Sequence, residues 1–223
     1  MATTAADAVQ AASKRGRRKS RTTGEERERA IMQTAERLLQ DRSVADISVD
    51  DLARGAGISR SAFYFYFPSK DAVVLTLVDR TAEEAKGLLD EASERLLEDP
   101  QAAWREILRS FFETFGAHRA VVRAATYLSA TNAEAHALRE RIMESWVTNA
   151  TAKIELVRES GGAPPGPPAR DLATALVQMN ERALSAIFVG EAPAVAEGRA
   201  IEVLSHVWLA AIYGAGRLDR RSP

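Results

Sequence analysis

An unbroken run of five aromatic residues, Phe63 to Phe67, is the most unusual chemistry-bearing feature of the sequence. A hydrophobic core needs only some members of such a run, so we expect Phe63 and Phe67 to face the core together, four residues apart. The others must then reach solvent or a ligand. Tyrosine hydroxyls can donate to phosphate oxygens, and an exposed aromatic ring can contact a thymine methyl group. The run therefore favours DNA contacts by Tyr64, Tyr66 and the following Lys70 over plain core packing.

A short helix and a tight turn are predicted just before the aromatic run. The Ser48 hydroxyl can accept the backbone N–H of Asp51 and so begin a helix. That helix ends at residues 55–57, where Gly57 supplies a left-handed or closely approached backbone. Ile58 follows as an apolar residue that points into the core.

A second short helix, from Arg60 to about Phe67, must then carry the aromatic side chains. Ser59 can cap its N-terminus, and Pro68 ends it. Two short helices joined by a turn that contains glycine are the ingredients of a helix-turn-helix. The N-termini at Ser48 and Ser59 would point outward, where backbone donors and the positive end of the helix dipole suit phosphate.

The rest of the chain is helical in pattern, with a helix to about Gln40 before the motif and no alternating stretch long enough for a sheet. We expect the loop at residues 161–168, GGAPPGPP, to be an ordinary connection between helices, with a PxxP-type recognition site as the weaker alternative. We predict an all-α fold, with an N-terminal three-helix helix-turn-helix domain and a larger C-terminal helical domain. The later helices are expected at residues 70–97, 101–117, 119–130, 133–159, 170–189 and 194–213.

The amino-acid composition excludes many kinds of catalytic site. The 223 residues carry 30 Lys+Arg and 31 Asp+Glu, and they include no cysteine and only three histidines. His118, His136 and His206 lie at no metal-ligand or triad spacing, and Gly55-x-Gly57 lacks the third glycine of a nucleotide loop. We therefore predict no catalytic residues, no metal site and no cofactor. The first 24 residues hold no signal-peptide core, and no run of 18 apolar residues occurs, so a cytoplasmic location is expected.

Basic residues gather at one end of the chain. Residues 14–21 contain six Lys or Arg side chains and no acid, so a basic arm precedes an acidic body. Such an arm is useful where an anionic partner is approached from one end. A solubilising tail is the simpler alternative. A membrane-surface role would need an amphipathic insertion helix beside the arm, and none is present.

Large apolar residues with one buried amide mark the C-terminal body. Trp104, Phe111 and Phe115 share one helix face, and Asn180 lies on an otherwise apolar stretch, where it needs a partner or a ligand. Core packing explains any one of these residues, but together they could enclose an apolar pocket with few polar groups. The candidate lining residues are Trp104, Ile107, Phe111, Phe115, Met143, Trp146, Asn180 and Trp208.

Residues 25–80 resemble the DNA-binding domain of TetR-type repressors, through the stretch DISVDDLARGAGISRSAFYFYFPSKDAVVLTLVDR. With MNER and WREILRSFFETFG, the likeness extends with gaps to about residue 214 and points to one branch of that family. It implies that Arg60, Ser61 and Ala62 face base edges and that Phe65 touches base methyl groups or sugar. It also implies that Tyr64, Tyr66, Lys70 and the Ser48 cap contact phosphate.

The same resemblance implies an effector pocket and a homodimer. In that branch the corresponding aromatic residues and asparagine line a long hydrophobic channel, and the last two helices pack against those of a second subunit. The implied domains are a disordered basic arm (1–24), a helix-turn-helix domain (25–70), a ligand-binding and dimerisation domain (71–214) and a flexible tail (215–223). The chain departs from the branch at four pocket positions, which are Arg139, Asn149, Val177 and Ser185.

The sequence therefore predicts a dimeric repressor that binds a palindromic operator in double-stranded DNA. A hydrophobic small molecule in the helical body would release it, because it favours a conformer with wrongly spaced recognition helices. A DNA-binding protein without an effector is the alternative.

Overall fold

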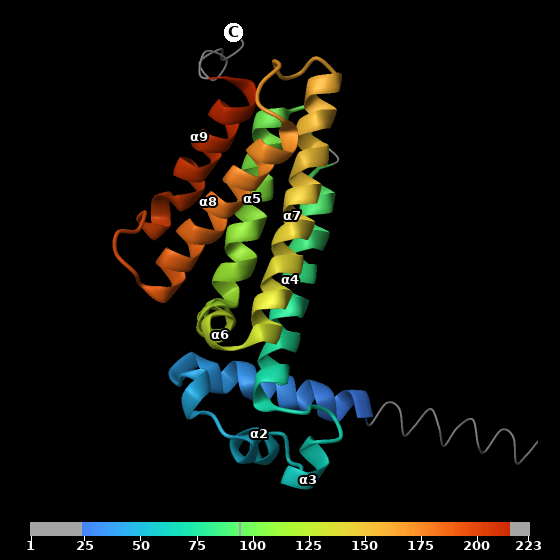
Figure 1. Cartoon of the computed structure of the whole chain (residues 1–223), viewed down its shortest axis with the longest axis vertical. Coiled ribbons are helices and arrows are strands. Elements are labelled where there is room, and N and C mark those ends of the chain that lie inside the picture. Colours follow the sequence, from blue (N-terminus) through green and yellow to red (C-terminus); the bar gives the residue numbers. More distant parts are fainter. Residues whose placement is uncertain (1–23, 94, 215–223) are drawn as a thin grey trace, which may run out of the picture. The chain divides into compact units, whose positions relative to one another are not determined.

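The computed structural model describes residues 24–93 and 95–214 (Figure 1). Within these residues every regular element is a helix, which confirms the predicted all-α class. The predicted tail at 215–223 and the basic arm, apart from Gly24, lie outside the described residues. The chain forms two compact units, one up to Val74 and one from Leu75 onward.

The first unit contains a helix over residues 24–41, the 3-10 helix η1 (Val44–Asp46), α2 (Val49–Gly55), α3 (Arg60–Phe63) and the start of α4 (Lys70–Ser93). Its core is small. Ile31, Leu52, Phe63 and Val73 are each at most 1% exposed. A Cβ built on Gly55 would lie 2.2 Å from Thr34 Cγ2, so α2 approaches the helix over 24–41 at a distance that only glycine allows here.

The second unit is a bundle of long helices: the remainder of α4, α5 (Pro100–Ala117), α6 (Arg119–Thr131), α7 (Ala133–Glu159), α8 (Ala169–Val189) and α9 (Ala200–Tyr213). Within it α7 packs against α8 and α5 against α9, and α6 lies across α7 and α8 (Figure 1). Side-chain caps begin two of these helices, because Asp99 accepts from Ala102 N and Asn132 accepts from the N–H groups of Glu134 and Ala135.

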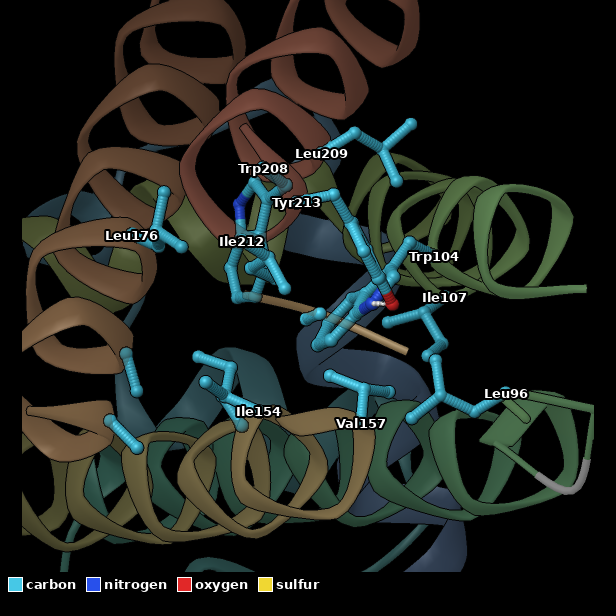
Figure 2. Packing of buried hydrophobic residues seen from close by; sticks show 14 of the residues in the cluster. Leu96, Trp104, Ile107, Ile154, Val157, Leu176, Trp208, Leu209, Ile212 and Tyr213 are labelled. Atoms are coloured by element: carbon cyan, nitrogen blue, oxygen red, sulfur yellow. Dashed lines mark hydrogen bonds between the residues drawn. The ribbon is translucent and has the colours of Figure 1, made fainter. Parts of the chain in front are cut away.

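Aromatic and aliphatic residues of α5, α7, α8 and α9 form the core of the second unit (Figure 2). The Trp104 and Trp208 ring centroids lie 5.0 Å apart. Trp104 Nε1 donates to the Tyr213 hydroxyl across 3.1 Å, and burial raises the pKa of that tyrosine. The ring contact and the hydrogen bond join α5 to the C-terminal end of α9.

Three predicted helix ends differ from the structure. The helix predicted over Arg60–Phe67 ends at Phe63, and i→i+3 bonds from Tyr66 N to Phe63 O (2.9 Å) tighten the chain before Pro68. The helix predicted to reach residue 97 ends at Ser93.

The helix predicted from residue 194 begins at Ala200, after the 3-10 turn η2 (Glu197–Arg199). A tertiary contact accompanies this difference. The Arg119 guanidinium reaches Glu197 Oε1 at 2.7 Å and so holds the turn beside the start of α6.

Candidate functional site

The N-terminus of α2 carries a complete capping box, as its sequence predicts. The Ser48 hydroxyl accepts from Asp51 N at 3.1 Å, and Asp51 Oδ2 accepts from Ser48 N at 3.1 Å. The Ser48 hydroxyl also donates to Asp51 Oδ2 at 2.8 Å, and this bond, with the Ser48 backbone N–H and Arg42, lowers the pKa of Asp51 to about 2. Both polar groups of Ser48 are therefore engaged within the cap.

The turn and the cap of α3 also follow the sequence pattern. Gly57 has φ +67°, which is the left-handed conformation expected of the turn. Ser59 Oγ accepts from Ala62 N at 3.2 Å and shares a 3.0 Å hydrogen bond with Ser61 Oγ. Ser59 and Ser61 are exposed, so the α3 N-terminus presents two hydroxyl groups to solvent.

The aromatic run divides between core and surface. Phe63 and Phe67 are buried at 0% and 5% exposure, which confirms their predicted core positions. Phe65 is 90% exposed and Tyr64 47% exposed, whereas Tyr66 is half-buried. An almost fully exposed phenylalanine is costly in water unless a partner covers it.

Arg60 is held at the surface beside Tyr64. Its Nη1 lies 2.7 Å from Asp50 Oδ2, its Nη2 lies 3.4 Å from the Tyr64 hydroxyl, and its guanidinium carbon stands 6.0 Å from the Tyr64 ring centroid. The charge of Asp50 raises the pKa of Arg60. Sequence reasoning missed this role of Asp50, because the partner lies ten residues away across the turn.

Lys70 has a different place from the one its sequence position suggested. Its Nζ lies 2.7 Å from Val44 O, 3.1 Å from Ala45 O and 2.8 Å from Ile47 O. An ammonium group has three N–H donors, so these carbonyls account for all of them. Lys70 ties the backbone around η1 to the start of α4 and has no remaining donor for phosphate in this arrangement.

The second unit contains a large cavity of about 340 Å³ among α4, α5, α6, α7 and α8. Its walls are mostly apolar, and Phe111, Phe115, Met143 and Trp146 belong to them. The Arg139 guanidinium, at one of the four pocket positions where the chain departs from the branch, pairs with Glu181 at 3.1 Å beside this cavity.

A small cavity of about 40 Å³ lies among α5, α7, α8 and α9. Trp104, Ile107, Asn180 and Trp208 line it. Trp208 Nε1 donates to Asn180 Oδ1 at 3.0 Å, which supplies the partner that this buried amide requires.

Phe111 and Trp146 belong to the walls of both cavities. Their ring centroids lie 4.8 Å apart in an edge-to-face arrangement. All eight pocket residues predicted from sequence therefore line one or both cavities. The sequence reasoning missed Lys153, which also lines the small cavity, because a single lysine on an amphipathic helix looks like a solvated residue.

The described residues contain no group of three or more His, Asp or Glu side chains placed to hold a metal ion. His136 lies 3.4 Å from Glu140 on the exposed face of α7, and His118 lies 3.6 Å from Glu84. Among the helices in the described ranges, none has the length and apolarity needed to cross a membrane.

Comparison with known proteins agrees with this geometry. Residues 31–77 match the model of the tetR family of bacterial regulatory proteins, and residues 104–214 match the C-terminal domain of the transcriptional regulator EthR. The chain is 50% identical over 215 residues to EthR of Mycobacterium tuberculosis, covering 96% of this chain and 100% of the relative. It is 46% identical to EthR of Mycolicibacterium smegmatis, over 93% of this chain and 95% of that protein.

Solved structures of TetR-family regulators have a similar fold. A TetR-family regulator from Syntrophomonas wolfei superimposes with a TM-score of 0.69 at 16% identity, over 83% of this chain and 94% of that one. These relatives are transcriptional regulators and not enzymes. The chain therefore belongs to the TetR family of bacterial transcriptional regulators, within the branch that contains EthR.

Proposed function

We propose that this regulator is a homodimeric repressor that binds a palindromic operator and leaves it when an apolar molecule fills the C-terminal cavities. Because such a repressor acts on bacterial DNA, the proposal includes a cytoplasmic location. The observation that carries the proposal is the exposed edge of α3 and the turn after it, where Arg60, Tyr64 and Phe65 reach solvent while Phe63 anchors the same segment.

Each exposed group has a defined role on DNA. Arg60 is the side chain at this edge that can contact a guanine through two hydrogen bonds, which contributes about 1–3 kcal/mol of discrimination. It must first leave Asp50, and that exchange costs little because both side chains are more than half exposed. Phe65 contacts thymine methyl groups or sugar, and Ser61 and Ala62 approach base edges without reading much sequence.

Phosphate contacts come from the groups around this edge. Tyr64 and Tyr66 donate hydroxyls to phosphate, and the N-termini capped by Ser48 and Ser59 direct backbone donors toward it. Lys70 supports this surface indirectly, because it fixes the backbone that precedes Ser48. The predicted basic arm would add charge contacts and so steepen the dependence of affinity on salt.

Dimerisation is proposed through the exposed faces of α8 and α9. Most large apolar residues of α8 and α9 pack within the subunit, among them Leu176, Leu204, Trp208 and Ile212. Two valines remain exposed, Val203 on α9 at 39% and Val189 on α8 at 36%. Val207 and Ala210 continue the face of Val203 at helical spacing and are half-buried. A two-fold pair of such surfaces would place two recognition segments on a palindrome.

Effector release follows from differential affinity. A ligand shifts the protein toward a conformer only by as much as it binds that conformer more tightly. The large cavity of about 340 Å³ lies within the size range of small-molecule sites. Because α4 continues from the first unit into this cavity wall, a change in α4 is the proposed link between ligand and DNA.

A mobility-shift assay on the duplex upstream of its own gene tests the proposal. Arg60→Ala and Tyr64→Phe should each weaken binding about tenfold or more, whereas Arg105→Ala on α5 should leave it unchanged. Unchanged binding in both α3 variants would contradict the DNA surface. A panel of apolar compounds that neither raises the melting temperature nor releases the duplex would favour a DNA-binding protein without an effector.

A further inference from the structure

The large cavity has mostly apolar walls, but α7 brings a charged side chain to it. Arg139 lies at helical spacing with Ile142 and Trp146, so the three side chains share one face of α7. All three line the cavity. A guanidinium group therefore borders the same space as the apolar residues that follow it along the helix.

The facing helix, α8, repeats this arrangement. Glu181, Leu184 and Phe188 follow the same spacing and also line the cavity. Arg182 is a further lining residue, and its Nη2 lies 2.6 Å from Glu191 Oε2. Glu191 is not one of the lining residues. The described lining thus has two guanidinium groups and one carboxylate, all of them on α7 and α8.

The Arg139–Glu181 pair takes up only one edge of the Arg139 guanidinium. Nε and Nη2 both donate to the same oxygen, Glu181 Oε1, at 3.1 Å each. A guanidinium has five N–H donors in a planar fork, and the Nη1 end lies outside this pair. Because the Arg139 side chain is 43% exposed, a second carboxylate can approach that end while Glu181 stays in place.

Stability does not require a charged pair at this position. Arg139 and Glu181 are 43% and 30% exposed, and ion pairs with that exposure add little to the free energy of unfolding. Charge has a larger effect on a ligand in the cavity, because the apolar walls exclude water and screen less than bulk solvent does. The pair is therefore better placed to select a ligand than to hold α7 and α8 together.

We infer that the large cavity binds an amphipathic carboxylate, whose head contacts the Arg139 guanidinium while its chain lies against the apolar walls. This inference deepens the proposed effector function and rests on it. Arg182 adds attraction for the anion, and the carboxylate of Glu181 opposes it. At about 30 Å³ for each water-sized group, the cavity of about 340 Å³ holds about eleven such groups, which is the size of a nine-carbon acid.

Calorimetric titration of the full-length protein with nonanoate, nonan-1-ol and nonan-1-amine near neutral pH tests this inference. Wild-type protein should bind nonanoate most tightly and the cationic amine most weakly. Arg139→Gln should weaken nonanoate about tenfold and change the alcohol less than about threefold. Glu181→Gln should instead strengthen nonanoate about threefold or more, because it removes a like charge and releases the guanidinium.

The opposite signs of the two variants distinguish a ligand contact from a structural ion pair, whose loss would have the same effect in both. A second ion pair between α7 and α8 supplies the matched control. Arg170 lies 2.8 Å from Glu144, and neither residue lines the large cavity. Arg170→Gln should change all three affinities by less than about twofold. Arg139→Lys, which keeps the charge without the planar fork, should weaken nonanoate less than Arg139→Gln does.

Release of the operator duplex by the same compounds separates this inference from the proposed function. If the alcohol releases DNA as well as the acid and Arg139→Gln changes neither, the effector function stands and the carboxylate assignment is wrong. If nonanoate binds through Arg139 and the duplex stays bound, the site is supported and the proposed release is contradicted. Tighter binding of the amine or the alcohol than of nonanoate by wild-type protein would overturn the assignment, and this comparison needs no variant to fold.

Discussion

The two units of this molecule handle their polar and apolar groups in opposite ways. In the first unit, the Ser48–Asp51 and Ser59–Ala62 caps satisfy polar groups within three residues of each other, and the rings of Tyr64 and Phe65 reach solvent. In the second unit, Trp104 and Trp208 are packed inside, and polar groups such as Asn180 and Lys153 are buried as well. The first unit therefore exposes aromatic rings, whereas the second unit encloses apolar cavities.

Because of this difference, substitutions in the two units should affect stability and binding differently. An exposed side chain in the first unit such as Phe65 should be removable with little effect on folding, because it buries little apolar surface. In the second unit a cavity wall is also a core residue, so a change there alters stability and ligand affinity together.

Two aromatic residues two positions apart should separate folding from DNA binding. Phe63→Ala removes a ring that is 0% exposed and should destabilise the protein by about 3–5 kcal/mol. Phe65→Ala removes a ring that is 90% exposed, so its stability should stay within about 0.5 kcal/mol of wild type. Denaturant unfolding measures both.

The order of the two variants should be reversed for DNA affinity. Under conditions in which Phe63→Ala is still folded, Phe65→Ala should bind the operator more weakly than Phe63→Ala. Phe65→Ala should lose about tenfold in operator affinity, which corresponds to one lost apolar base contact. A large stability loss in Phe65→Ala would contradict the exposed position of this ring.

The close approach of α2 to the helix over residues 24–41 should make Gly55 intolerant of a side chain. Gly55→Ala places a Cβ 2.2 Å from Thr34 Cγ2, and the forced shift should cost about 1–3 kcal/mol. Adding Thr34→Ala should restore part of that loss in the double variant. Gly87→Ala on α4, where nothing lies within 4 Å, should instead stabilise by about 0.5–1 kcal/mol.

Local chemistry explains how much of the first unit the sequence could predict. The caps at Ser48 and Ser59 and the left-handed Gly57 depend on residues within three positions, and all three agree with the structure. The helical pattern did not show where α3 ends, because the i→i+3 bonds that tighten the chain before Pro68 leave the spacing of apolar residues unchanged. The position of the Lys70 ammonium depends on carbonyls more than 20 residues away.

The cavities of the second unit were predictable by residue type but not by shape. Helical spacing placed Trp104, Phe111 and Phe115 on one face, and these residues do line cavities. That Phe111 and Trp146 divide the space in two, and that Lys153 faces the smaller part, depends on how four helices pack. No spacing along the chain encodes that arrangement.

Breaking a buried hydrogen bond in the second unit should reduce the free energy of unfolding more than removing the hydroxyl of an exposed tyrosine does. Tyr213→Phe leaves Trp104 Nε1 without its acceptor and should destabilise the unit by about 1–2 kcal/mol. Tyr127→Phe on α6 is the control, since that side chain is 51% exposed, and it should stay within about 0.5 kcal/mol. Equal effects in urea unfolding would contradict the assigned bond.

The smallest effect concerns acid, and it should be confined to the first unit. The pKa of Asp51 is lowered from 3.8 to about 2 by Ser48 and Arg42, so its carboxylate stabilises the folded state above pH 4. That contribution should disappear as pH falls from about 4 to 2, because the unfolded state binds the proton first. Asp51→Asn should remove this part of the acid dependence and leave the slope above pH 5 unchanged. Since Asp51 fixes the α2 N-terminus, the loss should appear in the near-ultraviolet signal of Tyr64 and Tyr66 before the tryptophan fluorescence of the second unit changes, and a simultaneous change would mean that the cap is not the acid-sensitive element.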